Sequence, residues 1–524
     1  MTKSFKKIGF IWLVVVALAG ATLPVYSQEF VVKKIKLRGV QYHPDQGVST
    51  RELEQKVNAW RWESYPENKL SLEDLEDLAY RVSKFYQDLG FSFVAAFVPR
   101  QKIKRGIVII QVKEDRLAEV TVRNVDESRR QAMLIEFEDM MGKPVFKPDL
   151  EEPILLLNDN PNREVFAYFS RGRDRGDTRL NLNVKEISKS NVSVGANNTG
   201  SPSTGKNRWW VSGTLNNMWG WDDQLSATIT QVIDYQENLF GQIHYQKYLG
   251  TRDSLSLSVV NNQYSLGEDL AALGLQGQYQ SASISKRTKL RRQFEFSSST
   301  VWNVSYRHSS LTSDVLPSLL NQSSDTGTIS YQYASTDYQV LFGDYLTKSA
   351  DVTGIVTVGG DSGVEDDAFV KFSGYLQSGK NIGAYVPGFI TRFTARVAVQ
   401  YAAQALPSAD KSPLGGESGV RAFDSSIFSA DESVVIQMKM SFMNRSKWGQ
   451  FEPYGFYDLG YGIRKALGDD VGAELSGYGL GLGYHYNGWL KVNSSYSQSR
   501  TVKVGDSDVG SSSRLSLGVE AVVW

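Results

Sequence analysis

A two-residue alternation of apolar and polar side chains fills the chain from about residue 188 to its end, and it constrains the fold more than any other feature. Successive side chains of a strand point to opposite faces, so the pattern predicts strands with one apolar and one polar face. The clearest runs are Leu225–Ile229, Leu255–Val259, Val301–Tyr306, Thr328–Tyr333 and Leu515–Val519. Polar turn clusters separate the runs and aromatic residues lie near their ends, as in outer-membrane β-barrels.

The alternating region is long enough for a complete barrel. At roughly 21 residues for each strand and its connection, residues 188–524 accommodate about sixteen antiparallel strands. A soluble β-sandwich or a β-helix would also explain the alternation. Neither explains the long polar loops and the terminal aromatic Trp524 together. We therefore expect a mainly β protein with a C-terminal transmembrane barrel over residues 188–524.

The first 27 residues have the pattern of a secretory signal peptide. A lysine-rich start precedes an apolar run, Ile8–Leu23, and the small residues Val25 and Ser27 suit the −3 and −1 positions of the cleavage site. The run is shorter than the ~20 residues of a membrane-anchoring helix, which is the alternative. Removing residues 1–27 takes away three lysines and no acid, which leaves 54 basic against 57 acidic residues. This weakly acidic balance argues against nucleic acid as a partner. The chain has no cysteine.

Between the signal peptide and the barrel, helix and strand patterns occur twice in the same order. Residues 28–115 and 116–187 each predict a β-α-α-β-β unit, which indicates an internal repeat of two small α+β domains. In the first, apolar residues recur at helical spacing between Ser71, a fitting N-cap, and Gly90, which is placed to end the helix.

The segment from Tyr86 to Glu114 resembles the first periplasmic POTRA domain of two-partner-secretion transporters. Residues 162–186 resemble the end of the second POTRA domain, and the similarity extends over essentially the whole mature chain. The resemblance implies two POTRA domains before an outer-membrane barrel. The matching residues of the first segment are Tyr86, Gly90, Phe91, Pro99, Gln101, Gly106, Val112 and Glu114.

Two further motifs of that family match inside the predicted barrel. A re-entrant loop with a Val-Arg-Gly-aromatic tip corresponds to Val420-Arg421-Ala422-Phe423, near residues 410–430, with alanine in place of glycine. An aromatic-x-Asp motif on a lumen-facing strand corresponds to Phe456-Tyr457-Asp458. The resemblance implies that Asp458 receives Arg421 and holds the loop against the inner wall.

The residues themselves are compatible with such a pair. An arginine confined inside a narrow barrel needs a carboxylate for its forked donors. Phe456 and Asp458 are two residues apart, so both point to one face, and Tyr457 points to the other. The alternative is that Arg421 is a solvated loop arginine and Asp458 a turn residue. Alanine does not adopt positive φ cheaply, so either the loop tip does not need this conformation here or its conformation differs from that of the family.

The resemblance implies a translocator that captures an unfolded exoprotein in the periplasm through its POTRA domains and exports it through the barrel, without enzymatic activity or cofactor. The implied partners are the secreted cargo, outer-membrane lipids, periplasmic chaperones and the barrel assembly machinery. An insertase of the same superfamily is the alternative, although its central members carry more POTRA domains. A passive porin or an outer-membrane enzyme fits the POTRA pair less well. No room for a plug helix is expected between Gln28 and the first strand, so pore closure would fall on the loops, including the one around Arg421.

The stretch GGDSGV around Ser362 resembles a serine-protease nucleophile motif. A nucleophile needs a positioned base and an oxyanion hole, and none of the four histidines lies in a supporting motif: His43, His244, His308 and His485. Ser362 is therefore expected in an ordinary strand connection. The acidic run 365–367 is expected to be a solvated loop rather than a calcium site.

Overall fold

The computed structural model describes residues 29–187, 190–220, 222–235, 237–338, 340, 343–360, 368–383, 387–466, 469–505, 507–508 and 511–523. The predicted signal peptide lies outside these residues, as do Ser362 and the acidic run 365–367. The chain forms two units. The first contains residues 29–116 together with two short segments, 142–146 and 173–177, and the second contains the remainder.

The first unit is an α+β domain that contains the predicted β-α-α-β-β order and adds a short pairing of β1 with β3. Its three-stranded sheet has the order β2-β5-β4, with β2 parallel and β4 antiparallel to β5, and two helices supply the rest of its core. The elements are β1 (Phe30–Val31), β2 (Lys34–Arg38), η1 (Pro44–Gln46), α1 (Thr50–Ser64), β3 (Lys69–Leu70), α2 (Leu72–Asp88), β4 (Val94–Phe97) and β5 (Ile107–Glu114).

Local signals set the bounds of α2, as the sequence predicts. The Ser71 side chain accepts a hydrogen bond from the Asp74 backbone N–H, and the Asp74 side chain accepts one from the Ser71 backbone N–H, which forms a capping box. Gly90 follows the helix with a φ of +106°, a conformation that glycine adopts without steric cost. The helix packs its apolar face, which includes Leu75, Leu78 and Val82, into the domain core.

The second unit begins with a similar α+β segment. Its sheet has the order β6-β8-β7. The spacing of residues 128–142 predicts one helix closed by Gly142, but the structure divides it, because its second half is a 3₁₀-helix that buries Phe137. Such tighter turns are common at helix ends. The elements are β6 (Arg116–Arg123), α3 (Glu127–Leu134), η2 (Ile135–Met140), α4 (Lys147–Asn158), β7 (Arg163–Arg171) and β8 (Asp177–Glu186).

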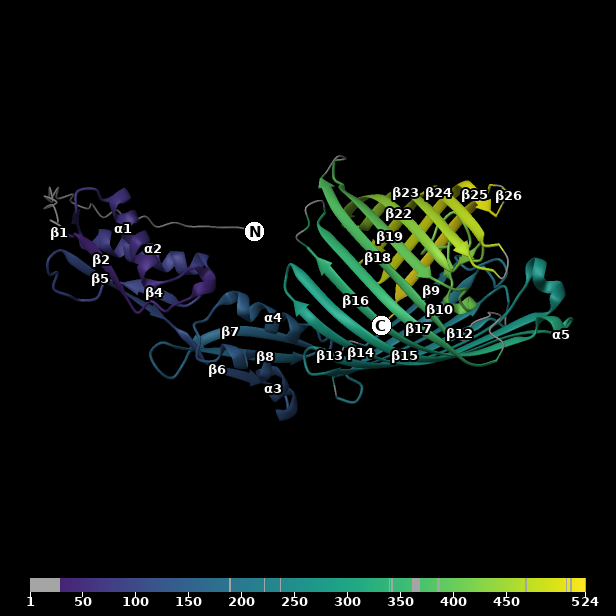
Figure 1. The fold of residues 1–524 in the computed structure, drawn as a ribbon, viewed down its shortest axis with the longest axis horizontal. Helices are drawn as coiled ribbons and strands as arrows, with labels where there is room; N and C mark the ends of the chain where they lie inside the picture. The colour runs from purple at the N-terminus through teal and green to yellow at the C-terminus, as the bar shows by residue number, and fades with distance from the viewer. Residues whose placement is uncertain are drawn as a thin grey trace, which may run out of the picture. The chain divides into compact units, whose positions relative to one another are not determined.

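The rest of the second unit is a closed antiparallel barrel, drawn from teal to yellow in Figure 1. In the described part of the chain it has 16 strands, with the two-residue β26 (Ser507–Asp508) as a hairpin on β25. The strands are β9 (Asn191–Asn197), β10 (Arg208–Asn216), β11 (Asp223–Val232), β12 (Leu239–Leu249), β13 (Asp253–Ser265), β14 (Leu275–Arg292), β15 (Phe296–Ser313), β16 (Gln322–Asp337), β17 (Tyr345–Gly360), β18 (Ala368–Gly383), β19 (Ile390–Ala402), β22 (Glu432–Ser446), β23 (Gly449–Arg464), β24 (Val471–Tyr486), β25 (Leu490–Val504) and β27 (Ser513–Val522). The short helices η3 (Glu268–Leu273) and α5 (Pro317–Leu320) lie in connections.

The alternation in the sequence corresponds to the two faces of the barrel wall. On β13 the apolar Leu257 and Val259 are exposed on the outside, whereas the intervening serines face the lumen. Many large apolar side chains are exposed in the same way on the other strands. An apolar outer face with a polar interior is the arrangement of a membrane barrel, so the predicted fold class is confirmed. No helix in the described ranges is long and apolar enough to cross a membrane.

Candidate functional site: a loop inside the barrel

The connection between β19 and β22, residues 403–431, folds back into the barrel. It contains the 3₁₀-helix η4 (Ser408–Asp410) and a short hairpin of β20 (Ser412–Pro413) and β21 (Ser429–Ala430). Its apolar side chains form one buried cluster with residues of the strands β22, β24 and β25. The loop members of this cluster are Leu414, Val420, Ala422, Phe423, Phe428 and Ala430.

Glycines on the inner wall allow the loop tip to approach the backbone of the strands. A methyl group added at Gly460 of β23 would lie 2.9 Å from a Val420 methyl carbon. One added at Gly477 of β24 would lie 2.5 Å from the Cβ of Ala422. Real Cβ atoms do not approach this closely, so the wall has room for the loop tip only because these positions lack side chains.

Arg421 and Asp458, which we call the tip pair, are in direct contact. The Nε and Nη2 atoms of Arg421 donate to the two carboxylate oxygens of Asp458 at 2.8 and 2.6 Å. The backbone N–H of Arg421 donates to the same carboxylate at 3.0 Å. The guanidinium carbon lies 3.8 Å from the centre of the Phe456 ring. The Asp458 side chain is 0% exposed and that of Arg421 is 15% exposed, so water competes little for either charge.

The other predicted motif residues surround this pair. Val420, Ala422 and Phe423 are buried in the loop cluster, and Phe456 is buried on the lumen face of β23. Tyr457 alternates with these inward residues and pairs with Tyr478, whose side chain is exposed on the outer face. Ala422 is absent from the described residues with positive φ. The tip of this chain therefore has a conformation that alanine adopts without strain.

Backbone carbonyls of the tip accept hydrogen bonds from the last strands and their connection. Ser512 Oγ donates to the Ala422 carbonyl at 3.0 Å, and Arg514 Nη1 donates to the Phe423 carbonyl at 2.9 Å. Arg514 also donates to the carbonyl of Thr199, between β9 and β10. The tip therefore contacts the barrel wall from β22 to β27.

Sequence reasoning missed a second ionic anchor of the loop, at Asp410. Arg307 of β15 donates from Nη1 and Nη2 to the two Asp410 oxygens at 3.0 and 2.8 Å. Lys371 of β18 lies 3.2 Å from the same carboxylate, and Gln400 of β19 donates to the Asp410 carbonyl at 3.2 Å. No local motif marks this cluster, because Arg307 and Asp410 are 103 residues apart. We call Asp410, Arg307 and Lys371 the root cluster.

In the first unit the predicted motif residues stabilise the domain itself. The fully buried Tyr86 donates to Glu114 Oε1 at 2.9 Å, and His43 Nε2 lies 2.7 Å from the other Glu114 oxygen. Burial and the Glu114 charge raise the pKa of Tyr86 far above its ordinary value, so the hydroxyl keeps its proton. Gln101 exchanges two hydrogen bonds with the backbone of Ile109.

The remaining motif positions of this unit, Gly90, Pro99 and Gly106, lie in its turns. Gly106 has a φ of +73°, and a Cβ there would lie 2.8 Å from the Lys33 side chain. Gly90 ends α2, and Pro99 follows β4 and accepts a hydrogen bond from Gln101. These five positions belong to the first unit, whereas the tip pair belongs to the second.

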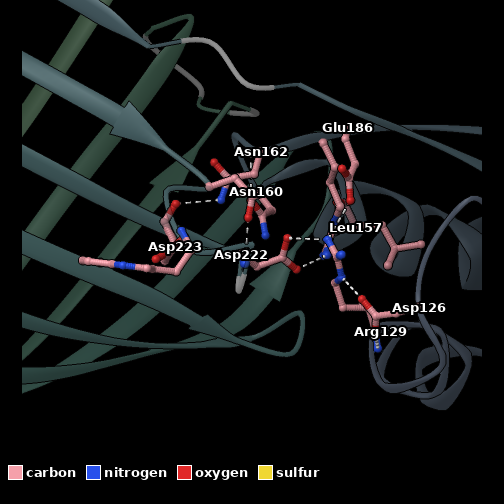
Figure 2. A network of polar contacts seen from close by, with 11 residues as sticks. Asp126, Arg129, Leu157, Asn160, Asn162, Glu186, Asp222 and Asp223 are labelled. Carbon is pink, nitrogen blue, oxygen red and sulfur yellow. Dashed lines mark hydrogen bonds and ion pairs between the residues drawn. The ribbon is translucent and has the colours of Figure 1, made fainter.

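Within the second unit, the α+β segment is joined to turns at one end of the barrel by polar contacts. Figure 2 shows Asn162 directed at Asp223 and Arg129 near Asp222. Arg163, whose side chain is 5% exposed, donates to Asp222 at 2.8 Å and to the Leu157 carbonyl at 3.0 Å.

The next two turns carry basic residues that meet acids of the segment. Arg252 contacts Glu136 and Glu152 at 3.1 and 2.9 Å, and Arg292 contacts Asp159 at 3.0 Å. The segment is therefore fixed to three consecutive turns of the barrel. Sequence reasoning did not identify this junction.

Two of the four histidines contact single carboxylates, His43 with Glu114 and His308 with Asp325. No group of three potential metal ligands is present among the residues that the structure describes.

Comparison with known proteins gives consistent matches over both units. The model of the haemolysin secretion/activation protein family ShlB/FhaC/HecB matches residues 176–484, and the ShlB-type POTRA domain model matches residues 30–115. The heme/hemopexin transporter protein HuxB of Haemophilus influenzae (strain 86-028NP) is 23% identical over 474 residues, which cover 85% of this chain and 80% of HuxB.

Two solved structures share the fold. CdiB from Escherichia coli has a TM-score of 0.68 at 17% identity, covering 97% of this chain and 93% of that one. BamA from Haemophilus ducreyi lacking POTRA domains 1–3 has a TM-score of 0.53 at 12% identity, covering 94% and 100%.

Proposed function

The chain belongs to the ShlB/FhaC/HecB family of haemolysin secretion/activation proteins. On this basis we propose a role in export for each of its domains. It is an outer-membrane transporter of two-partner secretion in a Gram-negative bacterium, with its POTRA domains in the periplasm. We propose POTRA domains over residues 28–115 and 116–187 and a pore domain over 188–524. The POTRA domains bind the unfolded exoprotein partner, the barrel conducts it, and folding outside the cell favours forward movement without catalysis by this chain.

The observation that carries the proposal is a difference between the sheet edges of the two POTRA domains. Side chains of α1 occupy the outer edge of β2: Asn58 Oδ1 accepts from the Ile35 N–H at 3.0 Å, and Glu54 accepts from the Leu37 N–H at 2.9 Å. On the opposite edge, Ser83 of α2 accepts from the Ala96 N–H of β4 at 2.8 Å. Both edges of this sheet are therefore partly occupied by the domain's own helices.

Edge strand β7 of the second POTRA domain presents more surface to a partner. Asn158 occupies this edge at Val165, where it exchanges two hydrogen bonds with the backbone. Beyond it, Phe166, Ala167 and Tyr168 are all exposed. Exposed edges accept an extended peptide by strand addition, and flanking side chains supply selectivity. An unfolded cargo offers such a peptide, so we propose β7 as a strand-addition site.

A proline at position 167 tests this site. Ala167→Pro removes one backbone N–H from the edge strand, where proline is tolerated, and it should reduce cargo secretion at least tenfold while the barrel assembles normally. Ala167→Ser changes the side chain but keeps the N–H, and it should secrete normally. Wild-type secretion by Ala167→Pro would exclude strand addition at this position.

Deletion of residues 28–115 tests the receptor role more broadly. It should abolish secretion and leave a heat-modifiable barrel in the outer membrane. Normal secretion by this deletion would refute the role of the first POTRA domain. We further propose that outer-membrane lipids contact the apolar outer face, and that periplasmic chaperones and the barrel assembly machinery deliver the chain.

A further inference from the structure

The two sides of the loop differ in how they contact the wall. On the tip side, the apolar cluster lies directly on glycine positions of β23 and β24, and the tip pair is enclosed. Asp458 has no cation other than Arg421 within ion-pair distance among the described residues. Moving the tip would therefore leave a fully buried carboxylate without its counter-charge and would expose the apolar cluster.

On the other side, residues 407–410 face a cavity of about 470 Å³. Its lining is mostly polar and includes Asn262, Tyr264, Tyr279, Arg307, Ser309 and Asp410. A second cavity of about 430 Å³ shares Asn262 and Tyr264 and continues along β10–β13. Both cavities therefore lie along the wall from β10 to β16.

The ion pair across this gap can open without leaving an acid unpaired. Asp410 is shared between Arg307 on the far wall and Lys371 on the near wall. If Arg307 separates, Asp410 keeps Lys371 at 3.2 Å and the Gln400 bond to its carbonyl. The loop also stays attached on this near side, because Leu406 packs fully buried against Ile355 and Phe369. The released Arg307 would face a polar, water-accessible cavity.

From this asymmetry we propose that cargo passes between residues 407–410 and the β13–β16 wall, and that the Arg307–Asp410 pair is the contact that opens. The tip pair remains closed and anchors the loop. The inference rests on the proposed export function and adds to it the path and the gating contact. It also assigns Lys371 as a positioning residue, which retains Asp410 while the pair with Arg307 is open.

The absence of native cysteine allows a direct test. In Arg307→Cys/Asp410→Cys, a short cleavable bis-methanethiosulfonate reagent joins the two sides of the gap. The matched control is Glu417→Cys/Gln437→Cys, which joins the loop tip to β22 where Gln437 already donates to the Glu417 carbonyl at 3.0 Å. Bridging 307 to 410 should lower secretion at least tenfold, with recovery after reduction. Bridging 417 to 437 should leave secretion within twofold of the unbridged protein.

Each other outcome overturns the gating assignment. If only the 417–437 bridge blocks export, the tip moves instead. If both bridges block it, the whole loop leaves the pore, and if neither does, cargo takes another path. Secretion by the unbridged double-cysteine protein measures the export function itself, so failure of the path and failure of the function are distinguishable.

A second measurement does not depend on cysteine variants. In planar bilayers, Arg307→Gln should raise the frequency of open events several-fold, because Asp410 then pairs only with Lys371. Lys371→Gln should lower it, because Asp410 then depends on Arg307 alone. Equal changes in the same direction for both variants would contradict the proposed division of roles.

Discussion

Replacing each member of the tip pair by alanine is the sharpest perturbation of the loop. Arg421→Ala removes two of the three hydrogen bonds to Asp458 and the stacking on Phe456, and it leaves only the backbone N–H at 3.0 Å. Asp458→Ala leaves the guanidinium without a carboxylate. Both variants should release the loop tip and strongly reduce secretion, because the anchor of the loop is lost.

The magnitudes follow from burial. Breaking a buried pair by removing one partner costs ~3–5 kcal/mol. The remaining Asp458 is 0% exposed, so Arg421→Ala should cost about 3–4 kcal/mol. The remaining Arg421 is 15% exposed and keeps Phe456, so Asp458→Ala should cost about 2–3 kcal/mol. At 1.4 kcal/mol per factor of ten, each change raises the detached population by roughly two orders of magnitude.

The double variant distinguishes a pair from two independent residues. Once Arg421 is gone, removing Asp458 relieves a stranded charge, so the double variant should lose no more than ~1 kcal/mol beyond Arg421→Ala. Arg421→Lys should also impair export, because an ammonium cannot make the planar two-pronged contact.

Secretion and open-state frequency in bilayers measure the effects, and heat-modifiable mobility checks assembly. Arg445→Ala, at an exposed position near the end of β22, is the matched control and should behave as wild type. Additive losses in the double variant, or wild-type secretion by Arg421→Ala, would refute the pairing argument.

Three further perturbations test neighbouring features. Deleting residues 410–430 should raise conductance many-fold in planar bilayers, and unchanged conductance would mean that the loop does not occupy the pore. Gly477→Ala places a methyl 2.5 Å from the Ala422 Cβ and should displace the tip at a cost of ~1–3 kcal/mol. Secretion should recover when Ala422→Gly is added, and no recovery would contradict Ala422 as the obstructing group. Arg163→Ala leaves Asp222 with Arg129 at 3.6 Å as its remaining cation and should accelerate limited proteolysis at the junction, whereas unchanged cleavage would show that other contacts suffice.

Local signals in the sequence predicted most of the fold. The capping box at Ser71 and the positive φ of Gly90 depend on neighbouring residues, so the bounds of α2 could be inferred without tertiary information. Two-residue alternation predicted the barrel because the membrane and the lumen impose opposite demands on the two faces of each strand. The division of the 128–142 helix was not predicted, since its apolar spacing does not distinguish a 3₁₀ turn from an α-helical one.

The candidate site was predictable only where a motif or the strand period marks it. Alternation put Phe456 and Asp458 on one face, and the motif resemblance joined them to Arg421. The root cluster depends on which strands the loop faces after the barrel closes. The residues next to Arg307 and Lys371 in the sequence form no motif that would predict these contacts. Long-range pairs of this kind require the register of the whole barrel.

The contact between Ala422 and Gly477 has a consequence for how this family varies. The loop tip and β24 share a fixed volume at this point, because the methyl of Ala422 occupies the space that any side chain at position 477 would need. The two positions should therefore be inherited as a matched pair. Relatives with the glycine of the tip motif at position 422 can carry alanine or serine at position 477, whereas those with alanine at 422 should retain glycine there. Alanine at position 422 of the tip motif and glycine at position 477 of β24 would then have evolved together.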